Sequence, residues 1–290
     1  MGVNELNIWF YNSAQVNFNI VGSNALWLKI LGFFNLVPIF NSFQIFGIIF
    51  ISKILQFAIY FYIYTIIGKK GDFIFAFSFL PNVFIFSMTV SRSSLDYALF
   101  SLIAVLSIFM VQKQFFSVMV ISLFFKTLIV LIGIVSFLSD RLIKNKYYFL
   151  VFSSIILILI FIFQNQIIEL TNLLYLQAAF GNYSFNQNEI INVFDLLSRS
   201  FQLVTPSVFY YQNIISFIFS FNYFIFYFYI YFYRKYLTPS DIFILMFYSL
   251  FSMPFVYNFF AVARYSSAIF LFILIRLILR KEIYSNYFKY

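Results

Sequence analysis

The chain contains no cysteine and no histidine among its 290 residues. The absence of cysteine excludes a disulfide framework and thiolate chemistry, and the absence of histidine removes haem ligation by imidazole and most zinc sites. We therefore expect neither a metal nor a cofactor. Glycine occurs only eight times and proline five times, and no linker or internal repeat is evident. The chain is expected to form one integral domain over residues 1–290.

Charged residues are also scarce. They make up 9% of the chain, whereas 63% is hydrophobic, with 48 Phe and 23 Tyr. No water-soluble core of this size needs so much apolar surface. The net charge of +9 comes from basic residues that stand singly or in small groups at the ends of apolar runs, which argues against a nucleic-acid partner. The composition predicts a multi-pass protein of the lipid bilayer.

Apolar stretches that approach or exceed the roughly 20 residues needed to cross a bilayer recur along the chain. Each is expected to be helical, because open sheets are not stable in lipid. The predicted fold is all-α, a polytopic transmembrane helical bundle of about 8–10 membrane segments with an external amphipathic loop region. Residues 25–41, which contain Lys29 and Pro38, are expected to form an interfacial or re-entrant helix. The other expected helices cover residues 43–67, 73–90, 97–111, 115–138, 148–163, 207–233, 242–253 and 257–279.

The orientation depends on Lys126, which lies near the middle of residues 115–138. A lone ammonium facing lipid would be costly there, so we expect two short helices, about 115–125 and 127–138, with Lys126 at the outer tip of a hairpin. Twelve of the eighteen basic residues then face the cytoplasm, as the positive-inside rule requires. These residues are Lys69, Lys70, Lys113, Arg141, Lys144, Lys146, Arg234, Lys235, Arg276, Arg280, Lys281 and Lys289.

The same topology makes residues 1–42 and 164–206 external. No signal peptide precedes the first of these stretches. We expect either an upstream helix that this sequence lacks or a short tail that the first span translocates.

Four basic residues fall on the external side, where positive charge is normally avoided: Arg92, Lys126, Arg199 and Arg264. Their guanidinium and ammonium groups suit phosphate oxygens, so they predict a pocket for an anionic, lipid-linked substrate. Alternatives remain open for each. Arg92 could pair with Asp96 at a helix start, Lys126 could snorkel to the membrane surface, and Arg264 could pair with a protein carboxylate.

The external stretch 164–206 carries a helical pattern near its end. Its apolar residues Ile190, Ile191, Phe194, Leu197 and Phe201 follow helical spacing, which predicts an amphipathic helix on the membrane surface. The polar and aromatic residues of 182–188 are a mixture that can hold sugars, but any solvated loop looks similar. The acids available as a general base for an acceptor hydroxyl are Asp96, Glu169, Glu189 and Asp195.

Four short motifs carry a family resemblance. They are Ser-Arg-Ser-Ser-Leu-Asp-Tyr-Ala-Leu-Phe-Ser-Leu (91–102), Lys-Gln-Phe-Phe (113–116), Leu-Phe-Phe-Lys-Thr-Leu-Ile-Val-Leu (123–131) and Ala-Val-Ala-Arg-Tyr (261–265). In this order they resemble the bacterial O-antigen and capsule polymerases of the Wzy and EpsG type. The resemblance covers roughly residues 40–280. EpsG-like proteins commonly have a histidine where Lys126 stands here.

The resemblance implies a multi-pass protein of the bacterial inner membrane that polymerises undecaprenyl-diphosphate-linked repeat units, with a chain-length regulator as a further partner. It implies catalytic roles for Arg92, Arg264 and Asp96, and substrate binding by Lys126, Arg199, Tyr265 and Asp195. One alternative is a lipid-phosphate-dependent glycosyltransferase of the GT-C class, although Glu5 is the one acid in the region where such enzymes carry an acidic motif. The other is a flippase for lipid-linked glycans, for which inverted repeats would be expected.

Overall fold

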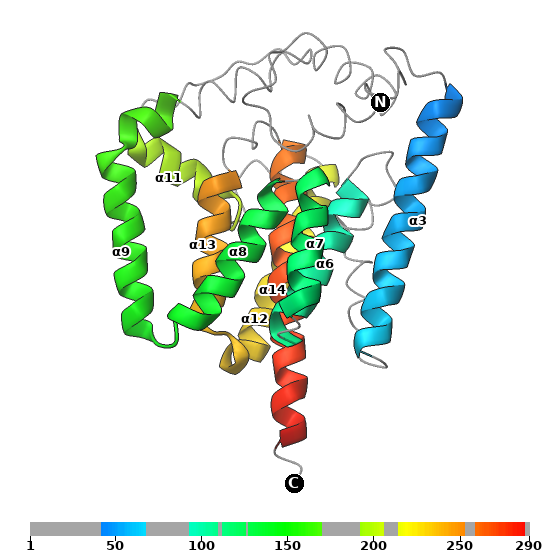
Figure 1. Cartoon of the computed structure of the whole chain (residues 1–290). Coiled ribbons are helices and arrows are strands. Elements are labelled where there is room, and N and C mark those ends of the chain that lie inside the picture. The colour runs from blue at the N-terminus through cyan, green and yellow to red at the C-terminus, as the bar shows by residue number, and fades with distance from the viewer. Residues whose placement is uncertain are drawn as a thin grey trace. The chain divides into compact units, whose positions relative to one another are not determined.

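The computed structural model describes residues 42–67, 93–109, 112–125, 127–169, 192–205, 214–252 and 259–287 (Figure 1). Within these residues every regular element is helical, which confirms the all-α prediction. The helices are α3 (Ser42–Ile67), α6 (Ser93–Phe109), α7 (Gln112–Phe125), α8 (Thr127–Leu142), α9 (Lys146–Ile162), α11 (Val193–Gln202), α12 (Ile214–Tyr233), the 3-10 turn η3 (Arg234–Tyr236), α13 (Pro239–Ser252) and α14 (Phe259–Tyr287).

Most helix bounds lie within a few residues of those expected from the apolar runs. The expected helices 25–41 and 73–90 lie outside the described residues. The last helix is the main exception, because α14 continues to Tyr287 instead of ending near residue 279. Arg280 and Lys281 therefore lie inside the helix together with Arg276, and not in a loop after it.

The chain divides into two compact units, residues 1–133 and 134–290. In the first unit α6 packs against both α3 and α7. Tyr97 and Phe100 of α6 are buried, and so are its small or branched residues Ala98, Ile103 and Ala104. Such residues allow helix axes to approach closely.

The helical stretch around Lys126 is divided where the sequence predicts. Helix α7 ends at Phe125 and α8 begins at Thr127, while Lys126 itself lies outside the described residues. Met119 and Gly133, seven residues before and after this point, are in contact: a Cβ at Gly133 would lie 2.8 Å from Met119 Sδ. A continuous helix would separate these two positions by roughly 20 Å. The two helices therefore fold back on one another as a hairpin.

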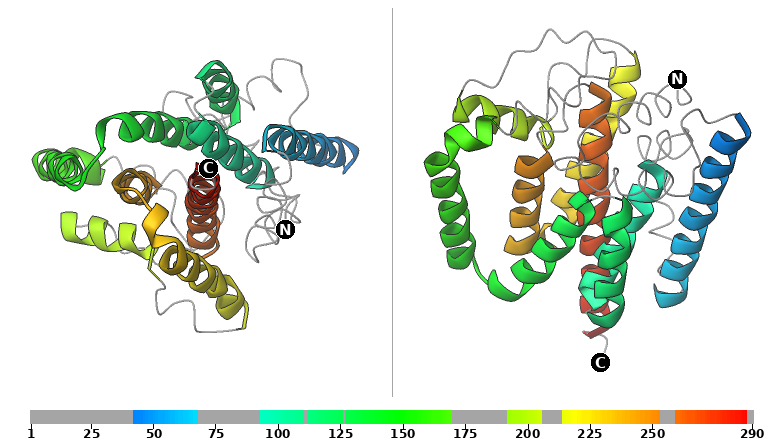
Figure 2. Two further views of the ribbon diagram at one scale, coloured as in Figure 1. Left: turned by 90° about the horizontal axis from the view of Figure 1, so that it is seen from below. Right: turned by 45° about the horizontal axis from the view of Figure 1, so that its top comes forward.

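In the second unit α14 packs against both α12 and α13 (Figure 2). The ring of Phe226 stacks on that of Phe270 at 3.9 Å, and Asn222 Nδ2 donates to Ser267 Oγ at 2.9 Å. On the α13 side, the Tyr248 hydroxyl donates to the backbone oxygen of Tyr265 at 3.0 Å. Every residue of α14 from Tyr265 to Leu279 is buried.

Within the described residues, one helical stretch, Val262–Lys281 of α14, is long and apolar enough to cross a membrane. Helices α3, α6, α9 and α13 contribute shorter apolar stretches. Nearly all of the α14 stretch is buried inside the protein, a property that it shares with the central helix of a soluble protein. Its length and composition are therefore weak evidence for a membrane span.

Helix α11 confirms that the end of residues 164–206 contains a helix. Asn192 caps it by accepting a hydrogen bond from the backbone N–H of Asp195 at 2.9 Å. Val193 is buried, whereas Phe194 and Phe201 of the expected apolar stripe are exposed. The Phe194 ring meets that of Phe161 in α9 edge-on at 6.3 Å, and the aromatic side chains of this helix otherwise stay exposed.

Gly133 tests the packing of the α7–α8 hairpin. Replacing it with Leu would place a branched side chain against Met119 and Ile103, and overpacking of this kind lowers the free energy of unfolding by about 1–3 kcal/mol. Gly133→Ala is the control, because the flexible Met119 side chain can move and alanine favours the helix, so we expect a change within about 1 kcal/mol. Thermal unfolding of the two purified variants and the wild type measures both changes in stability. Equal melting temperatures for Gly133→Leu and the wild type would contradict the hairpin contact.

Candidate functional site

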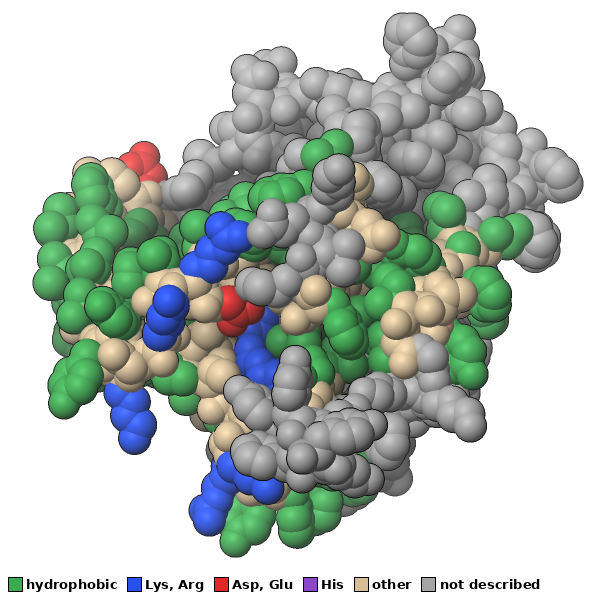
Figure 3. Space-filling model, turned by 60° about the horizontal axis from the view of Figure 1, so that its bottom comes forward, with side chains coloured by type: hydrophobic (Ala, Val, Ile, Leu, Met, Phe, Trp, Pro, Cys, Tyr) green, Lys and Arg blue, Asp and Glu red, His purple; other side chains and the backbone are tan. Residues whose placement is uncertain are grey.

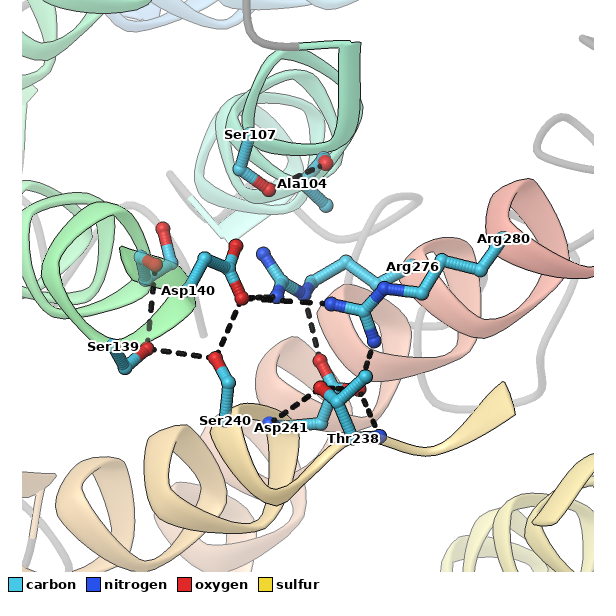
Figure 4. A network of polar contacts seen from close by, with 10 residues as sticks. Ala104, Ser107, Ser139, Asp140, Thr238, Ser240, Asp241, Arg276 and Arg280 are labelled. Atoms are coloured by element: carbon cyan, nitrogen blue, oxygen red, sulfur yellow. Dashed lines mark hydrogen bonds and ion pairs between the residues drawn. The ribbon is translucent and has the colours of Figure 1, made fainter. Parts of the chain in front are cut away.

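The most extensive polar cluster among the described residues lies in the second unit, where the end of α8, the start of α13 and the last third of α14 meet (Figure 4). The start of α13 is shaped locally by the sequence Thr-Pro-Ser-Asp, 238–241. Asp241 Oδ2 accepts hydrogen bonds from the backbone N–H and the hydroxyl of Thr238, at 3.0 and 2.9 Å. Pro239 occupies the first helical position. This is a capping box, which fixes the Asp241 carboxylate at the helix start.

Two carboxylates and two guanidiniums form a closed arrangement, which we call the charge ring: Asp140, Asp241, Arg276 and Arg280. Arg276 donates from Nε to Asp241 Oδ1 at 2.8 Å and from Nη2 to Asp140 Oδ1 at 2.6 Å. Arg280, one helical turn further along α14, pairs with Asp241 Oδ2 through Nη1 and lies 3.5 Å from Asp140 Oδ1 through Nη2. Each arginine thus contacts both carboxylates.

Hydroxyl groups extend the charge ring toward α8. Ser240 Oγ donates to Asp140 Oδ1 at 2.6 Å and lies 2.8 Å from Ser139 Oγ. The side chains of Arg276 and Asp241 are 0% exposed, whereas those of Asp140 and Arg280 are 16% and 12% exposed. The ring is therefore closed to solvent at Arg276 and Asp241 and reaches the surface at Asp140 and Arg280.

The charge ring balances two positive charges with two negative ones. Removing such groups from water costs several kcal/mol for each ion, and their attraction offsets this cost only when the hydrogen-bond geometry is good. The paired donors and acceptors satisfy that requirement. A metal ion has no place between the carboxylates, because the two guanidiniums occupy that space, and no group of three potential ligands occurs elsewhere in the described part of the chain.

The topology prediction counted Arg276 and Arg280 among the basic residues of the cytoplasmic side and made no prediction about their burial. Arg276 is buried because two partners distant in sequence, at positions 140 and 241, meet it. The other basic clusters of this unit do gather at the same end of the helices. Exposed or half-exposed Lys and Arg side chains surround the charge ring there (Figure 3): Arg141, Lys144, Lys146, Arg234, Lys235 and Lys281.

The predicted site residue Arg264 lies near the other end of α14, twelve positions before Arg276 and therefore about 18 Å away along the helix. Its side chain is half-buried. Arg264 Nη2 donates to the hydroxyl of Tyr265 at 3.3 Å, and its guanidinium carbon lies 5.0 Å from the centre of the Tyr265 ring. Arg264, predicted to be catalytic, and Tyr265, predicted to bind substrate, are neighbours in the sequence, and their side chains are in contact.

Only some of the remaining predicted site residues lie in the described part of the chain. Asp96 lies half-buried in the first turn of α6, where a carboxylate favours the helix dipole, and it belongs to the first unit. Asp195 occupies the equivalent place in α11 of the second unit. Glu169 is exposed at the end of the described stretch 127–169. Arg92, Lys126, Glu189 and the side chain of Arg199 lie outside the described residues.

The charge ring and the Asn222–Ser267 pair were not predicted from the sequence. The Thr-Pro-Ser-Asp pattern was readable as a helix start, and the spacing of Arg276 and Arg280 places them on one face of a helix. No local signal identifies Asp140 as their partner.

Comparisons of the chain with protein-family models, curated proteins and solved structures found no match.

Substitution of Arg276 tests the charge ring. We expect Arg276→Met to lower the free energy of unfolding by about 3–5 kcal/mol, because it leaves Asp241 buried without its central partner. Arg280→Met should have a smaller effect, since Arg280 is partly exposed and Arg276 still contacts both carboxylates.

A double-mutant cycle provides the control for this prediction. Asp241→Asn removes the charge that Arg276→Met leaves uncompensated. The loss in free energy of unfolding of the double variant should therefore be smaller, by at least about 1 kcal/mol, than the sum of the losses of the two single variants. Denaturant unfolding of the four proteins measures this difference. Strictly additive effects would show that the two residues are not coupled.

Proposed function

We propose that this chain is a polytopic protein of the bacterial cytoplasmic membrane that polymerises undecaprenyl-diphosphate-linked oligosaccharide units on the outer face. The membrane part of the proposal is supported by the helix surfaces. Helix α9 exposes Leu150, Val151, Ile155 and Ile158, and α12 exposes Phe224 and Phe228. Large apolar side chains that stay exposed over several turns are unfavourable in water and favourable in lipid.

The proposed activity is supported mainly by the position of Arg264. It is a half-buried arginine on the most enclosed helix, at the end remote from the charge ring and from the basic side chains around it. If the basic end faces the cytoplasm, Arg264 lies toward the outer face. An arginine in this position is suited to an anionic group that enters from that side.

The proposed chemistry is transfer of a glycan chain. A hydroxyl of the next lipid-linked unit attacks the anomeric carbon of the chain's reducing-end sugar. The bond from that carbon to the diphosphate oxygen breaks, undecaprenyl diphosphate leaves, and a carboxylate such as Asp96 accepts the hydroxyl proton. Arg264 and Arg92, together with Lys126 and Arg199, stabilise the charge that develops on the leaving diphosphate. Tyr265 holds the Arg264 side chain through the contacts described above.

The absence of cysteine allows a direct test of the orientation. Single cysteines at Lys144, in the exposed turn between α8 and α9, and at Ser198, on the exposed side of α11, would be the only thiols in the chain. We expect a membrane-impermeant maleimide to label Ser198→Cys in intact cells, and Lys144→Cys only after permeabilisation. Labelling of both sites in intact cells, or the reverse order, would contradict the proposed topology.

The glycan profile tests the activity. In a strain that lacks this gene, complementation with the wild type should restore a ladder of long polysaccharide chains. Arg264→Ala should leave single repeat units, because loss of one preorganised donor typically costs on the order of 10²–10³ in rate. Arg264→Lys keeps the charge and should recover part of the ladder.

Gln166→Ala, on an exposed polar side chain, is the control and should behave as the wild type when the variants are equally abundant. A complete ladder with Arg264→Ala would refute the assigned role. A truncated repeat unit in the deletion strain would favour a GT-C glycosyltransferase instead.

A further inference from the structure

The basic side chains that surround the charge ring form a continuous feature, which we call the basic rim: Arg141, Lys144, Lys146, Arg234, Lys235 and Lys281. They come from the α8–α9 turn, from η3 and from α14. These elements are held together, since Asp140 of α8 accepts from Ser240 of α13, and Lys281 of α14 donates to the Tyr233 hydroxyl at 3.2 Å. The basic rim is therefore one surface of the second unit.

Nearby acids do not neutralise this surface. Asp140 and Asp241 are both engaged by Arg276 and Arg280 in the charge ring. The sequence places one further acid, Glu282, beside Lys281. A clear positive excess remains, and it is displayed outward because five of the six rim residues are exposed and the sixth is half-exposed.

Local helix physics does not account for Lys146, the first residue of α9. Asn145 caps α9 by accepting from the backbone N–H groups of Tyr147 and Tyr148 at 3.0 and 3.1 Å. Lys144 and Lys146 flank this cap. A positive charge at a helix N-terminus is unfavourable, since that end already carries partial positive charge. The position of Lys146 therefore favours an anionic partner outside the chain, whereas Lys144, two residues after the end of α8, also suits the negative end of that helix.

Tyrosine side chains lie next to the basic rim. Lys281 Nζ lies 4.6 Å from the Tyr233 ring centre, and Arg234 Cζ lies 5.6 Å from that of Tyr231. Tyr147 is 79% exposed at the start of α9, directly before the apolar exposed side of that helix. The order along α9 is thus basic, then tyrosine, then aliphatic. This order matches the layers of a membrane from its headgroups to its hydrocarbon.

We propose that the basic rim is a binding surface for the headgroups of anionic phospholipids in the cytoplasmic leaflet. Lysine and arginine supply the charge for the phosphate groups, and the exposed tyrosines occupy the boundary between the headgroups and the acyl chains. This inference rests on the proposed membrane location but not on the glycan chemistry. The charge ring supports it by fixing the ends of α8, α13 and α14, so that the rim residues remain together.

The test uses the purified full-length protein in a neutral detergent. Short-chain phosphatidylglycerol is added in increasing amounts, with phosphatidylcholine and inorganic phosphate in parallel, and the thermal unfolding temperature is followed. We expect phosphatidylglycerol alone to raise this temperature in a saturable manner. The double variant Lys144→Gln/Lys146→Gln should bind it more weakly, by about fivefold for each charge lost.

Two further variants separate binding from folding defects. Lys144→Arg/Lys146→Arg keeps the charge and should bind as the wild type, whereas Arg234→Gln/Lys235→Gln removes charge from the other part of the rim and should weaken binding similarly. Equal shifts with the two lipids, or unchanged binding by both glutamine variants, would overturn the inference. Saturation by inorganic phosphate or by a short DNA duplex at lower concentrations than phosphatidylglycerol would also overturn it.

A separate measurement distinguishes this inference from the proposed function. Alkaline carbonate extraction of cell membranes shows whether the chain is integral. Release of the protein would reject the membrane location and both proposals with it. Retention in the membrane, together with no preference for phosphatidylglycerol, would reject the lipid surface alone.

Discussion

The charge ring of Asp140, Asp241, Arg276 and Arg280 is the interaction on which the second unit depends. Four ionised groups are brought together where little water reaches them, and each loses its hydration. The arrangement is stable only if the three helices that supply the groups stay in register. Because a guanidinium pairs best in one plane, the ring restricts rotation of α14 as well as its distance from α8 and α13.

Several other features follow from this restriction. With its last third held by the ring, α14 can pack over most of its length against the aromatic residues of α12 and against Tyr248 of α13. The capping box of Thr238 and Asp241 links the start of α13 to the same carboxylate. The ends of these helices also bring the basic rim together. One polar cluster thus determines the core, the helix starts and the charged surface of this unit.

The sequence predicts the positions of the helices better than the contacts between them. Apolar runs gave the positions of most described helices, and the cost of placing Lys126 in lipid predicted the break between α7 and α8. The charge ring could not be predicted, because Asp140 and Arg276 are 136 residues apart and no periodic pattern links them. Positive-inside reasoning counts basic residues near helix ends without regard to their burial, so it could not separate the buried Arg276 from the exposed Arg141. Of the seven predicted site residues, Arg264 and Tyr265 have side chains in contact, and these two are already neighbours in the sequence.

The number of residues between Arg264 and Arg276 limits which changes α14 can accept during evolution. Twelve helical residues advance about 18 Å and turn through a little more than three revolutions, so the two arginines point in directions about 120° apart. With Arg276 fixed, the depth and direction of Arg264 are fixed as well. Deleting one residue between them would rotate Arg264 by about 100° and shift it by about 1.5 Å. Substitutions can alter this stretch of α14 without this effect, but a change in its length would alter the direction of Arg264 relative to the charge ring.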